Sequence, residues 1–297
     1  MARVLNFGSL NIDHVYQVPH FVQPGETIHS SGYAQHFGGK GLNQSIALAR
    51  AGAPVAHAGC IGLDGFALRD FLQTNGVGTE NIRPVDSPTG HALIQVDGTG
   101  QNCIILYGGA NRHIPDAMVD QVLGTYTAGD YLLLQNEING LAHIMDRALA
   151  RGIHVVLNPS PVLSPQHMLP LNRLHCLLVN EVEGASLAGT TQPDEILPTL
   201  MAMYPDTRIV MTLGSEGAVY GHNGEQLFQP AFSVTAVDTT AAGDTFTGYF
   251  VDSLLRGMDA KVALARAAAA AAIAVTRPGA ADSIPQADEV EAFLKRR

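Results

Sequence analysis

Short apolar runs alternate with longer helical segments along almost the whole chain, and this alternation restricts the possible folds more than any other feature. Runs rich in Val, Ile and Leu predict strands at 3–8, 54–60, 131–135, 153–157, 175–179 and 208–213. Helical patterns predict helices at about 42–51, 64–75, 139–151, 194–204, 244–256, 260–275 and 286–296. Apolar strands that alternate with helices are typical of a parallel sheet covered on both faces. The sequence therefore predicts an α/β fold with a doubly wound, mostly parallel sheet sandwiched by helices.

Two regions, about 14–37 and 89–107, depart from this alternation. In the second, the apolar runs 92–96 and 103–107 flank Asp97–Gly98–Thr99–Gly100, a pattern typical of a hairpin with a glycine-containing turn. We expect the two regions to form a small β-sheet that projects over the ligand crevice. Such a lid would exclude water from a reaction, and its strands could equally serve dimerisation. Residues 1–297 would then form a single α/β domain with this lid.

Charge and cysteine content exclude several classes of protein. The chain has 17 basic and 27 acidic residues, so its formal net charge of −10 argues against nucleic acid as a partner. Cys60, Cys103 and Cys176 are widely spaced, which favours neither a disulfide framework nor a zinc site and fits a reducing cytoplasm. No leader pattern and no long apolar stretch is apparent. We expect a cytoplasmic protein that binds no membrane.

Several predicted strands end in polar residues, namely Asn11 and Asp13, then 135–137, Asn158, 180–181 and Thr212. Ligands of open α/β sheets bind beyond the carboxyl ends of the strands. Each polar tip taken alone favours an ordinary turn over a ligand site, because Asn and Thr commonly start turns. Their repetition across the sheet favours one shared ligand site.

The segment 237–246 ends an extended run and opens a predicted helix. The small side chains of Ala241, Ala242 and Gly243 would let an anion approach the unpaired N–H groups of the helix start. Asp244 beside that anion suggests a base that removes a proton from a hydroxyl attacking phosphorus. An ordinary helix cap is the alternative interpretation.

The glycine-rich stretch 37–45 is not a P-loop, because Ala34 stands where the first glycine is needed and Gly41 where Ser or Thr should hold magnesium. Close approach to its glycine backbone suits a polyhydroxylated ligand, with Lys40 and Asn43 supplying hydrogen bonds.

Other common chemistries lack their motifs. Gly98–Thr99–Gly100 is followed by Cys103 where a dinucleotide fingerprint needs a third glycine. Neither a GxSxG elbow nor an HExxH zinc motif occurs. Hydride transfer, serine hydrolysis and zinc catalysis are therefore unsupported.

Four motifs, GGKGLNQS, NEVEG, TLGSEG and DTTAAGDTFTG, stand in the order and spacing of the PfkB family of carbohydrate kinases, which the chain resembles over essentially its whole length. Within this family it is most similar to the ribokinase group, because NID, GGAN, LQNE and AIAVTR also match at 11–13, 108–111, 134–137 and 272–277. The resemblance implies ATP-dependent phosphorylation of the primary hydroxyl of a small sugar, D-ribose giving D-ribose 5-phosphate.

The resemblance also implies roles for particular residues. The sugar would be bound by Asn11, Asp13, Gly39, Lys40, Asn43 and Glu137. Asp244 would be the general base, with an anion hole formed by Ala241, Ala242 and Gly243. ATP would be bound by Asn180, Thr212, Leu213, Gly214, Ser215, Glu216, Gly217 and Gly243, with Ala268 where relatives often place a polar residue near adenine. Magnesium is associated with Glu183, and potassium with Asp238, Thr240, Ala274, Arg277, Gly279 and Ser283.

Alternatives stay open at this point. Another PfkB-type kinase, acting on deoxyribose, a different sugar or a nucleoside, would share these motifs. A nucleoside would need an aromatic platform, and none is obvious around Asn11 and Asp13. A non-catalytic sugar-binding protein on the same fold is a further alternative, which intact Asp244, Gly243 and Lys40 argue against. We expect a homodimer through the lid strands.

Overall fold

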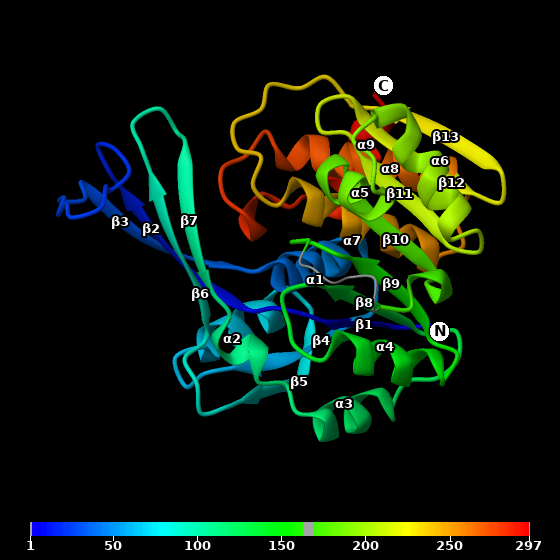
Figure 1. Cartoon of the computed structure of the whole chain (residues 1–297), viewed down its shortest axis with the longest axis horizontal. Coiled ribbons are helices and arrows are strands. Elements are labelled where there is room, and N and C mark those ends of the chain that lie inside the picture. Colours follow the sequence, from blue (N-terminus) through cyan, green and yellow to red (C-terminus); the bar gives the residue numbers. More distant parts are fainter. Residues whose placement is uncertain (1, 163–168, 297) are drawn as a thin grey trace.

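A computed structural model describes residues 2–162 and 169–296, and within them a sheet of nine strands forms the centre of the molecule (Figure 1). The strand order is β13-β12-β11-β10-β9-β8-β1-β4-β5. The bounds are β1 (Val4–Phe7), β4 (Val55–Ile61), β5 (Gly78–Pro84), β8 (Tyr131–Gln135), β9 (His154–Asn158), β10 (Cys176–Asn180), β11 (Arg208–Thr212), β12 (Gly217–His222) and β13 (Glu225–Pro230). The seven strands β11, β10, β9, β8, β1, β4 and β5 pair in parallel, and β12 and β13 add an antiparallel edge. This confirms the predicted sheet.

Helices cover both faces because successive strand residues point to opposite sides. Val4 and Leu133 pack in one core, whereas Leu5, Leu132 and Leu134 pack in the other. The first core contains residues of α1 (Lys40–Ala51), α2 (Phe66–Thr74), α7 (Ala242–Leu255), α8 (Ala260–Ala274) and α9 (Ala287–Leu294). The second contains or contacts residues of α3 (Asp116–Leu123), α4 (Leu141–Leu149), α5 (Glu181–Ala188) and α6 (Pro193–Met203).

Small side chains bring α1, α7 and α8 close together. A Cβ on Gly248 of α7 would lie 2.4 Å from the Cβ of Ala47 on α1, so only glycine permits this approach. In α8, Ala267, Ala269 and Ala270 are fully buried. The alanine-rich segment is thus a thin helix packed against its neighbours, as its composition predicts.

The sequence patterns predicted most of the helices and strands but missed α3, α5 and the strands β5, β12 and β13. Both missed helices have eight residues, too few for a clear period. The missed strand β13 is mostly exposed and polar at the sheet edge, so it lacks an apolar signal.

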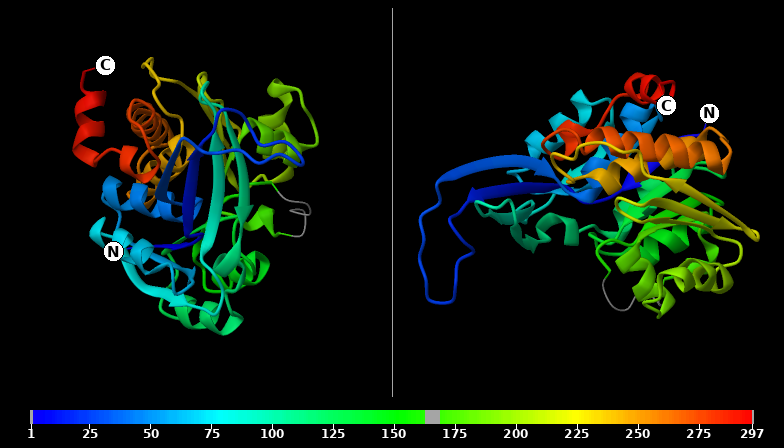
Figure 2. Two further views of the ribbon diagram at one scale, coloured as in Figure 1. Left: turned by 90° about the vertical axis from the view of Figure 1, so that its left-hand side faces the viewer. Right: turned by 90° about the horizontal axis from the view of Figure 1, so that it is seen from above.

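A second sheet of four strands, in the order β3-β2-β6-β7, projects from the main body of the described chain (Figures 1 and 2). It consists of β2 (Asn11–Gln17), β3 (Gly32–Gly38), β6 (Gly90–Val96) and β7 (Asn102–Tyr107). Strands β6 and β7 form the predicted antiparallel hairpin. Because β2 begins just after β1 and β3 ends just before α1, the base of this sheet lies beside the carboxyl ends of the central strands. Within the described residues, no helix is long and apolar enough to cross a membrane.

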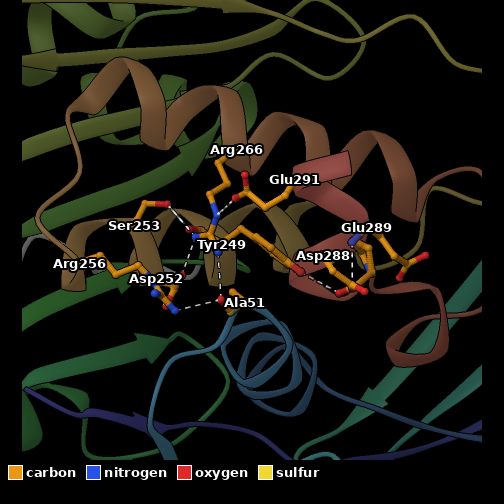
Figure 3. Close-up of polar contacts among 10 residues, drawn as sticks. Ala51, Tyr249, Asp252, Ser253, Arg256, Arg266, Asp288, Glu289 and Glu291 are labelled. Carbon is orange, nitrogen blue, oxygen red and sulfur yellow. Dashed lines mark hydrogen bonds and ion pairs between the residues drawn. The ribbon is translucent and has the colours of Figure 1, made fainter. Parts of the chain in front are cut away.

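A network of charged side chains connects α7, α8 and α9 beside the C-terminal end of α1 (Figure 3). Arg266 of α8 donates from Nη1 to Asp252 Oδ2 of α7 at 2.5 Å and from Nη2 to the carbonyl of Ala51 at 3.0 Å. Arg256 Nε donates to the same carboxylate at 2.9 Å, and Glu291 of α9 lies 3.5 Å from Arg266 Nε. Asp252 is fully buried and Arg266 is 4% exposed, whereas Arg256 and Glu291 are half-exposed, so Asp252 and Arg266 are the buried pair on which the network depends.

We predict that Asp252→Ala lowers the free energy of unfolding by about 3–5 kcal/mol, because it leaves the Arg266 guanidinium buried without its carboxylate. Urea unfolding followed by circular dichroism measures this. The matched control is Arg256→Gln, which removes a half-exposed partner of the same carboxylate and should change stability by less than about 1 kcal/mol. Equal effects of the two variants would contradict the assignment.

Candidate active site

A cavity of about 230 Å³ opens where the carboxyl ends of β9, β10 and β11 face the N-terminus of α7. Its lining includes Lys40 from the start of α1, Asp244 and the backbone-rich segment 241–243. The other wall includes Asn180, Glu183 and Thr212. Lys40 of the glycine-rich turn and Asp244 of the DTTAAGDTFTG motif therefore line the same cavity.

The start of α7 is built to receive an anion. No side chain caps this helix, and Ala241 at its N-cap has φ 60° and ψ 9°, a left-handed conformation that residues other than glycine seldom adopt. A Cβ on Gly243 would meet no atom within 4 Å, so the space in front of it is open. Uncapped N–H groups and the helix dipole favour a negatively charged group here.

Asp244 is 7% exposed, and side-chain amides of α1 bind both of its oxygens. Asn43 Nδ2 donates to Oδ2 at 3.0 Å, and Gln44 Nε2 donates to Oδ1 at 2.8 Å. The carboxylate is thus held in place by neutral donors rather than by an ion pair. Each carboxylate oxygen has more than one lone pair, so both can accept a further hydrogen bond from a ligand.

The sugar-site residues named from the sequence lie around the start of α1. Glu137 Oε2 accepts the N–H of Lys40 at 3.1 Å and the hydroxyl of Ser9. Asp13 lies against Gly38, where a Cβ would come within 2.0 Å of Asp13 Oδ2. Glycine at position 38 is therefore needed for the carboxylate to occupy its place.

Asparagines supply further polar groups there. Asn111 Nδ2 donates to Asn11 Oδ1 at 2.7 Å and fixes that side chain. Asn43 Oδ1 is buried and has no hydrogen-bond partner among the described residues. A buried acceptor without a partner is destabilising until a donor arrives. A ligand hydroxyl would provide that donor, so this part of the site suits a polyol.

The charges in the site influence one another. Burial raises the pKa of Asp13 to about 6, an effect to which the charge of Glu137 adds and which His36 opposes. Burial also raises the pKa of Glu137. Burial alone would lower the pKa of Lys40, but the carboxylates of Asp244, Glu137 and Glu183 outweigh it and raise that pKa. Lys40 is therefore a cation within a ring of acids.

On the opposite wall, Asn180 and Glu183 close the first turn of α5. Asn180 Oδ1 accepts the N–H of Glu183 at 2.8 Å, and Glu183 Oε2 accepts the N–H of Asn180 at 3.0 Å, forming a capping box. Glu183 is 5% exposed, so one of its oxygens serves the fold. Asn180 and Glu183 of the NEVEG motif therefore also have a structural function, the ordinary helix start for which such strings are common.

Of the remaining residues predicted to bind the nucleotide, some line the cavity and others do not. Thr212 lines it, whereas 213–217 form the turn between β11 and β12, closed by the Leu213 N–H donating to the Gly217 carbonyl at 2.8 Å. Ala268 is buried in α8 and does not belong to the cavity lining.

The two segments associated with potassium lie side by side. Asp238 Oδ1 accepts the N–H of Thr240, and Oδ2 accepts the N–H of Gly279, both at 2.9 Å. Arg277 pairs with Glu289 of α9, and Ser283 Oγ donates to the carbonyl of Ala280 at 2.8 Å. Ala274 is the buried last residue of α8. The carboxylate of Asp238 is therefore a brace between the segments.

The hydrogen bonds of Asp238 limit which groups could bind a cation between these segments. Both oxygens of Asp238 are already bound to backbone N–H groups. Nowhere in 2–162 or 169–296 do three His, Cys, Asp or Glu side chains gather as a metal site. A cation between these segments would depend on backbone carbonyls and hydroxyls, ligands that suit a hard ion.

Sequence reasoning gave no role to Ser9, Gln44 and Asn111, which hold the predicted ligand residues in place. Gln44 carried a signal, because it is a polar residue on the buried face of a helix between Leu42 and Ile46. Ser9 follows the first strand without any pattern that marks it.

The chain matches the family described as pfkB family carbohydrate kinase over residues 1–287. A ribokinase from Haemophilus influenzae is 39% identical over 297 residues, covering 97% of both chains. Two solved structures are similar along their length. The ribokinase from Cryptococcus neoformans in complex with ADP has a TM-score of 0.86 at 36% identity and covers 98% of this chain and 99% of its own. The ribokinase from Arabidopsis thaliana complexed with ribose and ATP has a TM-score of 0.88 at 30% identity and covers 99% of each.

We predict that Asp13 makes stability depend on pH. Because burial raises its folded pKa to about 6 from 3.8, the folded chain holds this proton more tightly, and stability should fall as pH rises through that window and level off above it. Asp13→Asn should remove about 2–3 kcal/mol of that fall, measured by urea unfolding between pH 4 and 7. The control is Asp86→Asn at an exposed position. Parallel pH curves for the parent and Asp13→Asn would contradict the prediction.

Proposed function

This chain belongs to the pfkB family of carbohydrate kinases, and we propose that it transfers the γ-phosphoryl group of ATP to the primary hydroxyl of D-ribose, giving D-ribose 5-phosphate. One observation carries the proposal: Asp244, held on both oxygens, shares a cavity with Lys40 and with the uncapped start of α7. The similarity to proteins named ribokinase supports ribose as the sugar.

The proposed reaction follows from the positions of these groups. Asp244 accepts the proton of the sugar hydroxyl as that oxygen attacks the γ-phosphorus, while the bond from this phosphorus to the β,γ-bridging oxygen breaks and ADP leaves. The N–H groups of 241–243 stabilise the charge that develops on the transferred oxygens. Lys40, which lines the same cavity, adds positive charge beside them. The cavity walls restrict water, which would otherwise compete as the acceptor.

Sugar recognition is assigned to the groups at the base of the projecting sheet. Asp13 and Glu137 accept hydrogen bonds from ring hydroxyls, and Asn43 Oδ1 accepts one more because it is otherwise unpartnered. Asn11, whose side chain is fixed by Asn111, and the backbone at Gly39 complete the set.

ATP is assigned to the opposite wall, along Asn180 and Thr212, with Gly243 at the phosphates. The turn 213–217, which follows Thr212 outside the cavity lining, would extend this site, and only the family resemblance associates Ala268 with adenine. Magnesium bound together with ATP would neutralise phosphate charge. Glu183 would contact it through water, since a capping-box carboxylate still has one oxygen to offer. Potassium would bind between the segments joined by Asp238, with ligands from Thr240, Ala274, Arg277, Gly279 and Ser283, and would fix the shape of the adjoining anion hole.

The projecting sheet is assigned a double role as lid and dimer interface. All residues of β7 are exposed, including Ile104, Ile105 and Leu106 at 48–60%. An exposed apolar edge strand favours pairing with a second chain. In this proposal residues 1–297 form one kinase domain that acts as a homodimer. A cytoplasmic location without nucleic acid or membrane partners stays a prediction.

A coupled ATP-consumption assay over ribose, deoxyribose, fructose and adenosine, with and without potassium, tests the substrate. We expect the highest kcat/KM for ribose and a higher rate with potassium. Preference for adenosine or deoxyribose would assign the chain to another kinase of the family. Sugar binding by calorimetry with no turnover would establish a non-catalytic protein instead.

Asp244→Asn should lower kcat by about 10²–10⁴-fold, because the variant lacks the proton acceptor. The affinity for sugar, measured by calorimetry, should change by less than about tenfold, since other groups bind the hydroxyls. Turnover like that of the parent would refute the role of Asp244.

A further inference from the structure

Gln44 is a buried polar residue to which the proposed function gives no task. It lies on α1 and is fully buried. Its Nε2 group donates to Asp244 Oδ1 at 2.8 Å and to Asn158 Oδ1, at the end of β9, at 3.0 Å. Both amide hydrogens are therefore used, and one of them holds the base.

We propose that Gln44 is a positioning residue for phosphoryl transfer, and that a chain of buried amides headed by Gln135 fixes the direction in which it donates. This inference rests on the proposed function, because it assigns Gln44 to the proton acceptor of that reaction. Gln44 does not touch the substrate itself.

The direction of the amide chain follows from its fixed far end. Asn6 Nδ2 donates to the carbonyl of Gly41 at 2.8 Å, and a carbonyl can only accept. Asn6 Oδ1 must therefore face Gln135, whose Nε2 donates to it at 2.9 Å. The same Nε2 donates to Gln44 Oε1 at 2.7 Å, which leaves only the NH₂ group of Gln44 for Asp244.

The near end of the chain requires the same direction. Asn158 Nδ2 donates to the carbonyl of Leu178 at 3.0 Å, so Asn158 presents its oxygen to Gln44. A reversed Gln44 amide would place Oε1 against Asn158 Oδ1 and the carboxylate of Asp244, three acceptors without a donor. The surrounding groups thus allow one orientation of Gln44.

The arrangement of these amides leaves one buried acceptor unsatisfied. Gln135 Oε1 is buried and has no hydrogen-bond partner within the described residues. Turning the Gln135 amide would not relieve it, because both Asn6 Oδ1 and Gln44 Oε1 need its hydrogens. An unpartnered buried acceptor is destabilising, so its presence indicates that the direction of donation matters.

Asn43 and Gln44 both bind Asp244, but only Asn43 also has a group assigned to the sugar. Asn43 binds Oδ2, but its own oxygen is unpartnered and is assigned to the sugar. Gln44 is fully buried, lies outside the cavity lining and uses both of its amide hydrogens within the protein. Removing Gln44 should therefore misplace the base without removing a sugar contact, and small misplacements of a reacting group reduce rates strongly.

The test compares Gln44→Met, which keeps length and loses the donors, with the parent. We expect kcat with ribose and ATP to fall about 10- to 100-fold while both KM values stay within about threefold. In the Asp244→Asn background, Gln44→Met should have no further effect on kcat, because the base that it positions is gone. A purely structural role would reduce kcat equally in both backgrounds.

The control is Thr207→Val, a change of a buried polar residue just before β11, at the end of that strand opposite the cavity, where Thr207 Oγ1 donates to the carbonyl of Leu171 at 3.1 Å. It should lower stability and leave kcat within about twofold, since it touches no part of the site. If Gln44→Met fails to fold, Gln135→Met replaces it, with an expected loss of about 3- to 10-fold in kcat at unchanged KM.

Each outcome decides. If the parent phosphorylates ribose but Gln44→Met leaves kcat unchanged or raises the KM for sugar, the role of Gln44 is overturned and the proposed function stands. A parent without turnover of any sugar overturns the proposed function and this inference with it.

Discussion

The rest of the site depends on the hydrogen bonds by which α1 holds the carboxylate of Asp244. Asn43 and Gln44 reach this acid from a helix 200 residues away in sequence, one amide to each oxygen. Gly248 allows α7 to lie close enough for these bonds to form. The glycine–lysine turn and the uncapped helix start face one cavity as a consequence, because each belongs to one of the two helices so joined.

The site concentrates features that a purely structural core avoids. Lys40 is surrounded by the carboxylates of Asp244, Glu137 and Glu183, Ala241 has a left-handed backbone, and Asn43 has a buried unpartnered oxygen. Such features lower stability and are typical of functional sites, where other parts of the fold offset them. The close packing of α1, α7 and α8 and the paired charges of Asp252 and Arg266 stabilise the helices that carry the site.

Much of the fold was predictable because its signals are local. Apolar runs and helical periods located the buried strands and long helices, and the turn 97–100 identified the hairpin. The short helix α5 was missed because its stability lies in the Asn180–Glu183 capping box rather than in a period. Of the candidate site, the sequence supplied the residues and their family roles but not their mutual contacts. The capping-box role of Glu183 and the bracing role of Asp238 appear only when their partners are in place.

The sequence by itself determined the α/β class, the glycine turn at 38–41 and the small residues before Asp244, since each of these follows from neighbours along the chain. Only the tertiary structure decided that Gln44 donates to Asp244 and that Gln135 fixes its direction. The physical reason is that a side-chain amide can donate or accept with equal ease. Its choice depends on which groups distant segments bring within about 3 Å of it, and no local pattern encodes that distance.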